Sequence, residues 1–336
     1  MNKLIELLRN FEKKTVLVIG DYCVDEYLEG DVQSIAPEAP VPRVRIGNKW
    51  VRMGAAGNVV LGIRALGART FAAGIIGDDA ISKELVKNLE EHVVHTEGLV
   101  FQKGRITPKF SRILAGGVHY PKQHVIRFDA ENEEDVREES VKSLIEFIRN
   151  NSEEFDAIIV ADYDEVDKGV IKRELLDAIV KVADEKGIIL IGDSRKNLAN
   201  FKGFTSVVPN IFEAELAYGR MIGQNEDDIF NAGKELIENL NLKSILITRD
   251  KEGMDLIEKE GDDFKKVSIP ILSKNVVDVT GAGDSVTCAF TLGLCSSGKD
   301  FVSSANLANH AASITIGKEG VVTVTKEELN EAIKNE

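Results

Sequence analysis

The sequence predicts an α/β protein in which a mainly parallel sheet lies between two layers of helices and carries a small β-sheet lid. Apolar, β-branched runs alternate with amphipathic helical patterns over most of the 336 residues, which is the pattern of a three-layer α/β/α sandwich. Two segments, about 26–48 and 95–128, interrupt this alternation and are rich in β-branched and basic residues, so we expect them to form the lid. A hydrophobic content of 43% supports a full core, and we expect residues 1–336 to form a single domain.

The first predicted strand, Thr15–Ile19, is an apolar, β-branched run that ends at Gly20 and Asp21, where we expect a turn. Strands of the same character follow at Phe71–Ile76, Ala157–Ala161, Ile188–Gly192, Ser206–Pro209 and Ser244–Thr248. Helical patterns lie between or after them, at Val59–Leu66, Ile81–Glu91, Ile171–Lys186, Ile211–Tyr218 and Glu226–Leu240. Ligands of such sheets bind at the carboxyl ends of the strands, so the segments that follow the strands are the candidates for a site.

Composition and charge narrow the classes of partner. The net charge of −14 argues against nucleic acid. Residues 4–11 are amphipathic with interleaved charges, unlike a signal peptide, and no run is long and apolar enough to span a bilayer. Cys23, Cys288 and Cys295 show neither metal-ligand spacing nor an even disulfide set. We therefore expect a cytoplasmic protein that binds a small molecule and neither nucleic acid nor a membrane.

The charge distribution is uneven along the chain. No acidic residue occurs from Ala39 to Gly77 or from Gly98 to Phe128. These two stretches hold twelve basic residues: Arg43, Arg45, Lys49, Arg52, Arg64, Arg69, Lys103, Arg105, Lys109, Arg112, Lys122 and Arg127. The arginine guanidinium can donate to two oxygens of one phosphate group at once. A basic lid on an acidic protein therefore indicates an anionic ligand. The alternative is a chance cluster of charge on solvated strands.

The run Asp278–Ser285 carries the strongest chemical signal. Gly281, Ala282 and Gly283 form a loop small enough for backbone N–H groups to approach an anion, and the apolar residues that follow predict a helix whose N-terminus adds further donors. Asp284 lies where a carboxylate can act as a base on the reaction partner of that anion. This combination suits the transfer of a phosphoryl group to a hydroxyl. The alternative is a glycine turn that caps an ordinary helix.

The run resembles the C-terminal signature of the ribokinase-like (PfkB) carbohydrate kinases, in which the loop steadies the transferring phosphate and the aspartate takes the proton of the sugar hydroxyl. A second signature of that family is similar to the segment Gly54–Asn58 with the spaced glycines Gly67 and Gly77. Two positions depart from it, since Ala55 stands where a second glycine is usual and Val60 replaces a small residue. The resemblance covers about residues 14–328 and implies a ribokinase-like fold.

The resemblance implies an ATP-dependent kinase with Asp284 as general base and the amides of Gly281–Asp284 as the anion hole. The sugar site that it implies comprises Asp25, Gly54, Asn58, Arg127, Asp162 and Lys168. Asn58 could instead be a plain N-cap of the helix that follows it. In the relatives the lid closes over the sugar and forms a dimer contact, so we expect a homodimer through the lid.

The nucleotide side follows from the same resemblance. The residues that match are Asn210, Glu213, Thr248, Gly253 and Asn309, and we add Arg195 to them. Glu213 is expected to order water on Mg²⁺, which prefers oxygen ligands and keeps part of its hydration shell. Asn210 and Glu213 also fit a capping box at a helix start, which is the alternative. The loop Gly317–Gly320, with the carbonyls around Asp278 and Thr280, resembles a monovalent-cation site, so K⁺ is a further expected cofactor.

The substrate is less closely defined than the reaction. Residues 34–42 and 123–129 resemble the heptose-7-phosphate kinases and the kinase half of bifunctional ADP-heptose synthases, which implies phosphorylation of a heptose 7-phosphate at O1. Three departures leave another phosphosugar open: Ala55, the extra residues between Tyr163 and Lys168, and Asp193-Ser194-Arg195 where those enzymes have Asp-Pro-Lys. The 336 residues hold no nucleotidyltransferase half, so we expect another protein to supply that step.

Three alternative functions were compared with the kinase. A kinase for a neutral sugar or nucleoside is disfavoured by the basic lid. A non-catalytic nucleotide or sugar sensor on the same fold would have no need of Asp284 with both flanking glycines. A nicotinamide dehydrogenase is weaker still, because no Gly-x-Gly-x-x-Gly follows the first strand.

Overall fold

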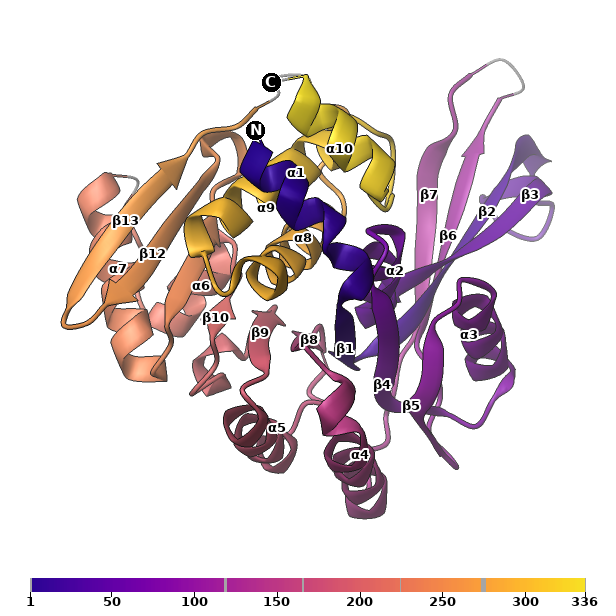
Figure 1. Ribbon diagram of the computed structural model, residues 1–336. Helices are drawn as coiled ribbons and strands as arrows, with labels where there is room; N and C mark the ends of the chain where they lie inside the picture. Colours follow the sequence, from indigo (N-terminus) through magenta and orange to yellow (C-terminus); the bar gives the residue numbers. More distant parts are fainter. Residues whose placement is uncertain (1, 118–119, 165, 224, 273–275, 336) are drawn as a thin grey trace.

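Two β-sheets organise the chain in the computed structural model, which describes residues 2–117, 120–164, 166–223, 225–272 and 276–335 (Figure 1). The large sheet has nine strands in the order β13-β12-β11-β10-β9-β8-β1-β4-β5. The small sheet has four, in the order β3-β2-β6-β7, and projects from one side of the large sheet (Figure 1). We refer to this four-stranded sheet as the lid.

The strands of the large sheet are β1 (Thr15–Gly20), β4 (Arg69–Gly77), β5 (His95–Gln102), β8 (Ala157–Asp162), β9 (Ile189–Ser194), β10 (Ser206–Val207), β11 (Ser244–Thr248), β12 (Met254–Glu260) and β13 (Asp263–Ile269). Those of the lid are β2 (Tyr22–Ile35), β3 (Pro42–Ala55), β6 (Lys109–Gly116) and β7 (Gln123–Ala130). The α-helices are α1 (Asn2–Arg9), α2 (Ala56–Ala65), α3 (Ala80–Glu91), α4 (Glu138–Asn151), α5 (Arg173–Lys186), α6 (Ile211–Tyr218), α7 (Glu226–Leu240), α8 (Ala282–Ser297), α9 (Phe301–Ile316) and α10 (Lys326–Lys334). Short 3₁₀ turns occur at Phe11–Lys13, Ser152–Glu154, Leu198–Asn200 and Asp250–Glu252.

The fold class predicted from the sequence is confirmed. Strands β11, β10, β9, β8, β1, β4 and β5 pair in parallel, and only the hairpin β12–β13 at one edge runs antiparallel. The predicted strand at residues 206–209 is shorter in the structure, because β10 ends at Val207, two residues before Pro209, which has no N–H to donate.

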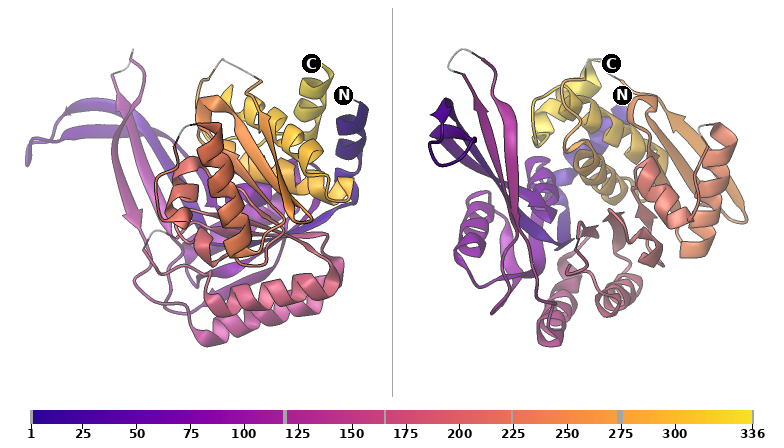
Figure 2. Two further views of the ribbon diagram at one scale, coloured as in Figure 1. Left: turned by 90° about the vertical axis from the view of Figure 1, so that its left-hand side faces the viewer. Right: turned by 180° about the vertical axis from the view of Figure 1, so that it is seen from behind.

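The strand β1 lies at the centre of the sheet and contributes to both cores. Val16 and Val18 belong to the core shared with α1, α2, α8, α9 and α10, whereas Leu17 and Ile19 belong to the core shared with α4, α5 and α7. This alternation places a helical layer on each face of the sheet. Figure 2 shows the two layers on opposite sides of the sheet.

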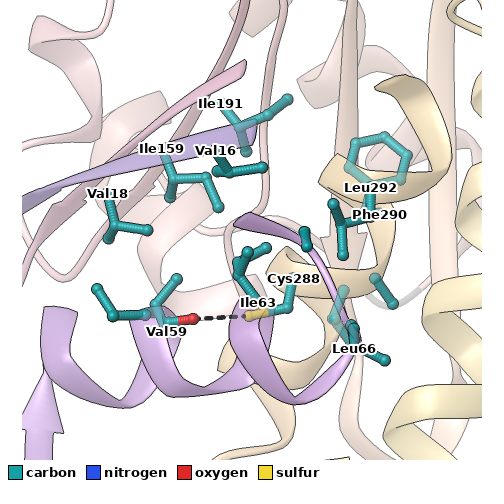
Figure 3. Packing of buried hydrophobic residues seen from close by; sticks show 14 of the residues in the cluster. Val16, Val18, Val59, Ile63, Leu66, Ile159, Ile191, Cys288, Phe290 and Leu292 are labelled. Atoms are coloured by element: carbon teal, nitrogen blue, oxygen red, sulfur yellow. Dashed lines mark hydrogen bonds between the residues drawn. The ribbon is translucent and has the colours of Figure 1, made fainter. Parts of the chain in front are cut away.

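The first of these cores packs α2 against α8 directly behind the site. Val59 and Ile63 of α2 face Val16 and Val18 of β1, and the thiol of Cys288 in α8 donates to the carbonyl of Val59 at 3.3 Å (Figure 3). Because α2 and α8 are held together there, their N-terminal ends, which carry Asn58 and Asp284, are also held close to each other.

The lid differs from its predicted extent at one point. The segment about 95–128 was expected to be lid throughout, but His95–Gln102 forms β5 and pairs in parallel with β4 in the large sheet. Its residues Gly98, Leu99 and Val100 align with β4, whose buried, apolar side chains favour a neighbour in the main sheet. The lid therefore draws on residues 22–55 and 109–130. Within the ranges that the structure describes, no helix is long and apolar enough to cross a membrane.

Candidate active site

Asp284 lies in the first turn of α8, directly after a glycine turn. Gly281 precedes the helix with φ of +81°, a left-handed conformation that glycine adopts without strain. The amides of Gly283 and Asp284 lie in the turn where a helix has no carbonyl of its own to accept them. Burial raises the pKa of the Asp284 carboxyl, and hydrogen bonds from Asn58 and Tyr163 lower it.

Two cavities meet at Asp284. One has a volume of about 230 Å³ and lies between the large sheet and the lid. The other has a volume of about 470 Å³ and lies along the C-terminal half of the sheet. We call them the lid-side and the C-terminal cavity. Three residues, Tyr163, Arg195 and Asp284, line both cavities, so a group held in one can reach a group held in the other at this wall.

Asp25 lines the lid-side cavity, as predicted for a residue that contacts the sugar. One of its oxygens accepts from Arg112 of β6, and the guanidinium of Arg112 also lies over the Tyr27 ring at 5.3 Å. The neighbouring strand leaves space for this carboxylate, because a Cβ added at Gly54 would lie 2.7 Å from Asp25 Oδ2. Gly54, which was expected to contact the sugar, does not line the cavity; its position instead makes room for the Asp25 carboxylate.

Asn58 is not the N-cap that a helix over Val59–Leu66 would require. The helix α2 already starts at Ala56, and Asn58 lies inside its first turn, 7% exposed, with Nδ2 donating to Asp284 Oδ2. Ala55, at the position where the resemblance leads one to expect glycine, has φ of +52° and lines the cavity. A side chain is strained in that conformation, which explains the usual glycine.

The basic residues of the lid are largely paired in space, although they are isolated from acids in the sequence. Lys49 and Lys109 pair with Glu26, Lys122 pairs with Asp31, and Arg127 donates to Asp129. The carboxylates come from β2 and β7, just outside the acid-free stretches. The inference of an unbalanced basic lid is therefore weaker than the sequence indicated, because β2 supplies the opposite charge for the three lysines and Asp129, on the same strand, supplies it for Arg127.

Arg105 differs from these residues. It is 5% exposed, lines the lid-side cavity, and its two Nη atoms donate to the carbonyls of Glu134 and Lys168 at 3.0 and 2.8 Å. Among the described residues it makes no ion pair, and its Nε has no partner. Burial lowers its pKa, and Asp21 and Asp164 oppose that shift.

Of three further residues expected at the sugar site, two line the lid-side cavity and one does not. Arg127 and Lys168 line the lid-side cavity. Asp162 lines neither cavity: it is 2% exposed at the end of β8 and accepts from Ser194 at 2.7 Å. Side chains alternate along a strand, so when Asp162 turns into the protein the next residue, Tyr163, faces the site.

The extra residues after Tyr163 form part of the lid-side cavity. Asp164 accepts from the amides of Val166 and Gly169 at 3.0 and 2.6 Å, which closes a tight loop, and the loop lines the cavity. Asp21, expected as a simple turn residue, also lines it and accepts from the amide of Val170 at 2.7 Å. Burial raises the pKa of Asp21 to about 7.

All six residues predicted for the nucleotide side line the C-terminal cavity: Asn210, Glu213, Thr248, Gly253, Asn309 and Arg195. Asn210 and Glu213 form the capping box of α6, with Glu213 Oε2 accepting from the Asn210 amide at 2.9 Å and Oε1 lying 3.8 Å from Arg195. The capping alternative and a site role are thus compatible, since Glu213 lines the cavity and its Oε1 takes no part in the capping bond.

Gly253 and Asn309 fix the walls of this cavity. Gly253 has φ of +88°, and an added Cβ would lie 2.2 Å from the Ile269 carbonyl oxygen, so no other residue fits there. Asn309 in α9 is 5% exposed and donates to the Pro270 carbonyl at 2.8 Å.

Asp278 and Thr280 hold the loop before α8 to a distant segment. Asp278 Oδ1 accepts from the amide and the hydroxyl of Thr280 at 2.9 and 2.7 Å, and Oδ2 accepts from the Gly320 amide at 2.9 Å. These hydrogen bonds lower the pKa of Asp278. Both oxygens of Asp278 therefore accept hydrogen bonds that hold the loop in place. A cation bound there would depend on backbone carbonyls. The described residues hold no cluster of three or more His, Cys, Asp or Glu suited to a metal.

Sequence reasoning missed two residues of the site. Tyr163 lines both cavities. Asp193, near the carboxyl end of β9, accepts a hydrogen bond from the Tyr163 hydroxyl at 2.7 Å. Both follow or end parallel strands, and that rule could have selected them without any motif.

In this three-layer fold, two cavities meet at the half-buried carboxylate of Asp284 beside the N-terminus of α8. Solved structures share the fold: phosphofructokinase-2 from Escherichia coli in complex with potassium has a TM-score of 0.75 at 18% identity, covering 96% of this chain and 98% of that one. Ribokinase from Arabidopsis thaliana, complexed with ribose and ATP, has a TM-score of 0.71 at 18% identity, covering 96% and 99%.

The chain belongs to the pfkB family of carbohydrate kinases, whose family model matches residues 13–328. Among curated relatives, the bifunctional protein HldE of Syntrophotalea carbinolica is 37% identical over 318 residues, and that of Citrifermentans bemidjiense is 36% identical over 323. The matches cover 94% and 95% of this chain but 62% and 64% of those proteins. The chain thus spans less than two thirds of the length of these relatives.

Proposed function

We propose that the protein transfers the γ-phosphoryl group of ATP to a hydroxyl of a phosphorylated sugar, and that this sugar is a heptose 7-phosphate phosphorylated at O1 to give the 1,7-bisphosphate. The observation that carries the proposal is the position of Asp284 at the wall between the two cavities. An acceptor in the lid-side cavity and a nucleotide in the C-terminal cavity would meet there.

The geometry supports a simple division of work. Asp284 takes the proton of the attacking hydroxyl as the new O–P bond forms and the bond to the β-phosphate oxygen breaks. Asn58 and Tyr163 donate to its two oxygens and so fix the plane of the carboxylate. The first-turn amides after Gly281 stabilise the charge on the transferring group, and most of the rate gain comes from positioning and electrostatics.

The metal and the nucleotide fit the residues of the C-terminal cavity. Glu213 keeps one oxygen outside its capping bonds, which suits contact with a metal-bound water, and Mg²⁺ when bound would neutralise phosphate charge. Thr248, Gly253 and Asn309 would line the rest of the nucleotide. A monovalent cation near Asp278 and Thr280 would depend on carbonyls of a loop that those side chains hold in place.

The phosphate of the acceptor is assigned to the basic residues of the lid-side cavity. Arg105, Arg127 and Lys168 line it, and Arg105 makes no ion pair among the described residues. The similarity to proteins named HldE supports a substrate of the heptose branch. The loop around Asp164 and the strained Ala55 lie in the same cavity, so a related phosphosugar is the second candidate.

We also propose that residues 1–336 act as one kinase domain that pairs through its lid. The strand β7 is exposed along its whole length, with Val125, Ile126 and Phe128 46, 52 and 47% exposed. Exposed apolar side chains on a sheet of this kind suit a contact with a second copy.

The test is an assay of ADP release with Mg-ATP and a panel of sugars: heptose 7-phosphate, other phosphosugars, and the matching neutral sugars. We expect turnover with the phosphosugars and the highest kcat/KM with heptose 7-phosphate. A higher kcat/KM with another phosphosugar would select the second candidate. Tight nucleotide binding without turnover on any sugar would favour the sensor and refute the kinase.

A further inference from the structure

The hydroxyl of Tyr163 lies between two carboxylates. Its oxygen is 2.8 Å from Asp284 Oδ1 and 2.7 Å from Asp193 Oδ2. Asp193 is 6% exposed, and the Arg195 guanidinium lies 5.4 Å above the Tyr163 ring. Tyr163 and Asp284 are half-buried, but both contacts of the Tyr163 oxygen are at hydrogen-bond distance, so each needs a hydrogen between its two oxygens.

The two contacts of the Tyr163 oxygen need two hydrogens, and the phenol supplies only one of them. A phenol has a single hydrogen to donate, and ionised carboxylates only accept. If both aspartates were ionised, one of the two contacts would place lone pairs against each other at less than 3 Å. The group of three therefore holds one proton in addition to that of the phenol.

The surroundings favour Asp193 as the carrier of that proton. Asp284 receives a second donor, the amide of Asn58, which stabilises its ionised form. Besides Tyr163, Asp193 receives among the described residues only the hydroxyl of Thr287, at 3.2 Å, and a hydroxyl can also accept. The charged groups that face Asp193 are Asp284 of α8, Glu213 of α6 and, beside it on its own segment, Arg195. Burial, followed by the charges of Asp284 and Glu213, raises the pKa of Asp193 to about 7.

We propose that Asp193 stores a proton which, through Tyr163, keeps the base Asp284 ionised and oriented for the reaction. In the active form Asp193 Oδ2–H donates to the Tyr163 oxygen, and the Tyr163 O–H donates to Asp284 Oδ1. This inference rests on the proposed role of Asp284 as base. Asp193 and Tyr163 are positioning residues, since neither has to touch the substrate.

The same pair defines an inactive form by a balanced shift of two hydrogens. The Asp193 hydrogen moves to the Tyr163 oxygen while the Tyr163 hydrogen moves to Asp284, so that two O–H bonds break and two form. The negative charge moves from Asp284 to Asp193, and no proton enters or leaves. In this form Asp284 cannot accept the proton of a sugar hydroxyl.

The kinetic test is a double-mutant cycle of Tyr163→Phe and Asp193→Ala, with Asp193→Asn as the mimic of the protonated state. We expect Y163F to lower kcat roughly 10–100-fold, as for loss of a hydrogen bond to a charged group, with little change in the KM for ATP. D193A should lower kcat in the wild-type background but add little to Y163F. D193N should keep kcat within about fivefold of wild type, because its amide donates to Tyr163 permanently.

The pH profile separates positioning from plain packing. The acidic limb of kcat/KM should shift in Y163F and D193N, since the exchange of the stored proton is then abolished. Additive losses in the cycle, with unchanged acidic limbs, would overturn the proposal. An Asp193→Asn protein as inactive as D193A would also overturn it. Y163F retains the ring, so it tests the same pair even if the Asp193 variants do not fold.

A second measurement counts the proton without any sugar or nucleotide. The infrared difference spectrum of wild type minus D193N at pH 6 should contain a protonated-carboxyl band, because the band of Asp21, whose pKa is also raised to about 7, is common to both proteins and cancels. If that difference band is missing, Asp193 stores no proton and the inference is wrong. If the band is present but no sugar is phosphorylated, the failure lies with the proposed function instead.

Discussion

The two cavities that meet at Asp284 are lined by different kinds of residue. Of the described residues that line the lid-side cavity, ten of 19 are charged: Asp21, Asp25, Glu131, Asp164, Asp284, Arg105, Arg112, Arg127, Lys168 and Arg195. In the C-terminal cavity six of 25 are charged: Asp193, Arg195, Glu213, Asp250, Lys251 and Asp284. In the proposed function, the acceptor therefore meets mainly charged side chains, and the nucleotide meets mainly shape and backbone groups. Changes in charge should act mainly on the first, and changes in backbone on the second.

The largest expected effect comes from the residue that the two cavities share. Asp284→Asn removes the base, so we expect kcat to fall about 10²–10⁴-fold. Because the amide keeps the shape of the carboxylate, nucleotide affinity measured by calorimetry should stay within a few fold. Turnover near the wild-type value would remove Asp284 from the role of base.

The backbone of the C-terminal cavity is tested by Gly253→Ala. An added Cβ would lie 2.2 Å from the Ile269 carbonyl oxygen, and φ is +88°. Strain and overpacking together should lower the free energy of unfolding by roughly 2–4 kcal/mol and raise the KM for ATP. Gly187→Ala is the matched control, since φ there is +70° but nothing lies within 4 Å of the new Cβ. Equal losses in the two variants would show that conformation, and not space, limits Gly253.

The charge of the lid-side cavity is tested by Arg127→Gln. Loss of a charged contact to the acceptor phosphate should raise the KM for the phosphosugar about tenfold and leave the KM for ATP unchanged. Lys122→Gln is the control, because Lys122 is also a lid residue paired with a carboxylate, Asp31, but does not line the cavity. The assignment of Arg127 to the phosphate fails if both variants behave alike.

The last prediction concerns the dependence of stability on pH. The folded-state pKa of Asp21 is raised to about 7, above its ordinary value of 3.8, so the folded protein binds more protons than the unfolded chain between these values. Stability due to Asp21 is therefore present at low pH and is lost as the pH rises toward 7. Asp21→Asn should raise the melting temperature at pH 8 and have little effect at pH 4. A melting curve that responds equally at both pH values would argue against a titrating Asp21.

The sequence predicted the nucleotide side better than the acceptor side, and the reason is physical. The resemblance supplied Asn210, Glu213, Thr248 and Gly253, and all four lie at the end of β11 or in the short segments that follow β10 and β11, so the order of the strands already places them near one another. The lid depends on pairing between strands far apart in the chain. For that reason the opposite charges beside Lys109 and Lys122, and the assignment of His95–Gln102 to the large sheet, were not visible.

Side-chain direction was the other limit. The choice between Asp162 and Tyr163 depends on which way β8 presents its last residue, and one step of register exchanges the two. Asp193 was read as part of a motif that departs from relatives, and its proximity to Asp284 depends on contacts between β9 and α8. The position of Asp284 needed no such information, because its loop and helix are contiguous.

The hydrogen bond from Asn58 to Asp284 joins residues 226 positions apart. A ribosome that has made the first half of this protein has already released the lid, the central strand β1 and the amide of Asn58, but not the carboxylate that the amide will orient. The proposed phosphoryl transfer therefore becomes possible only late in synthesis, when α8 docks beside α2. Until then a nascent chain holds much of the proposed acceptor side but lacks the carboxylate that the proposed reaction needs.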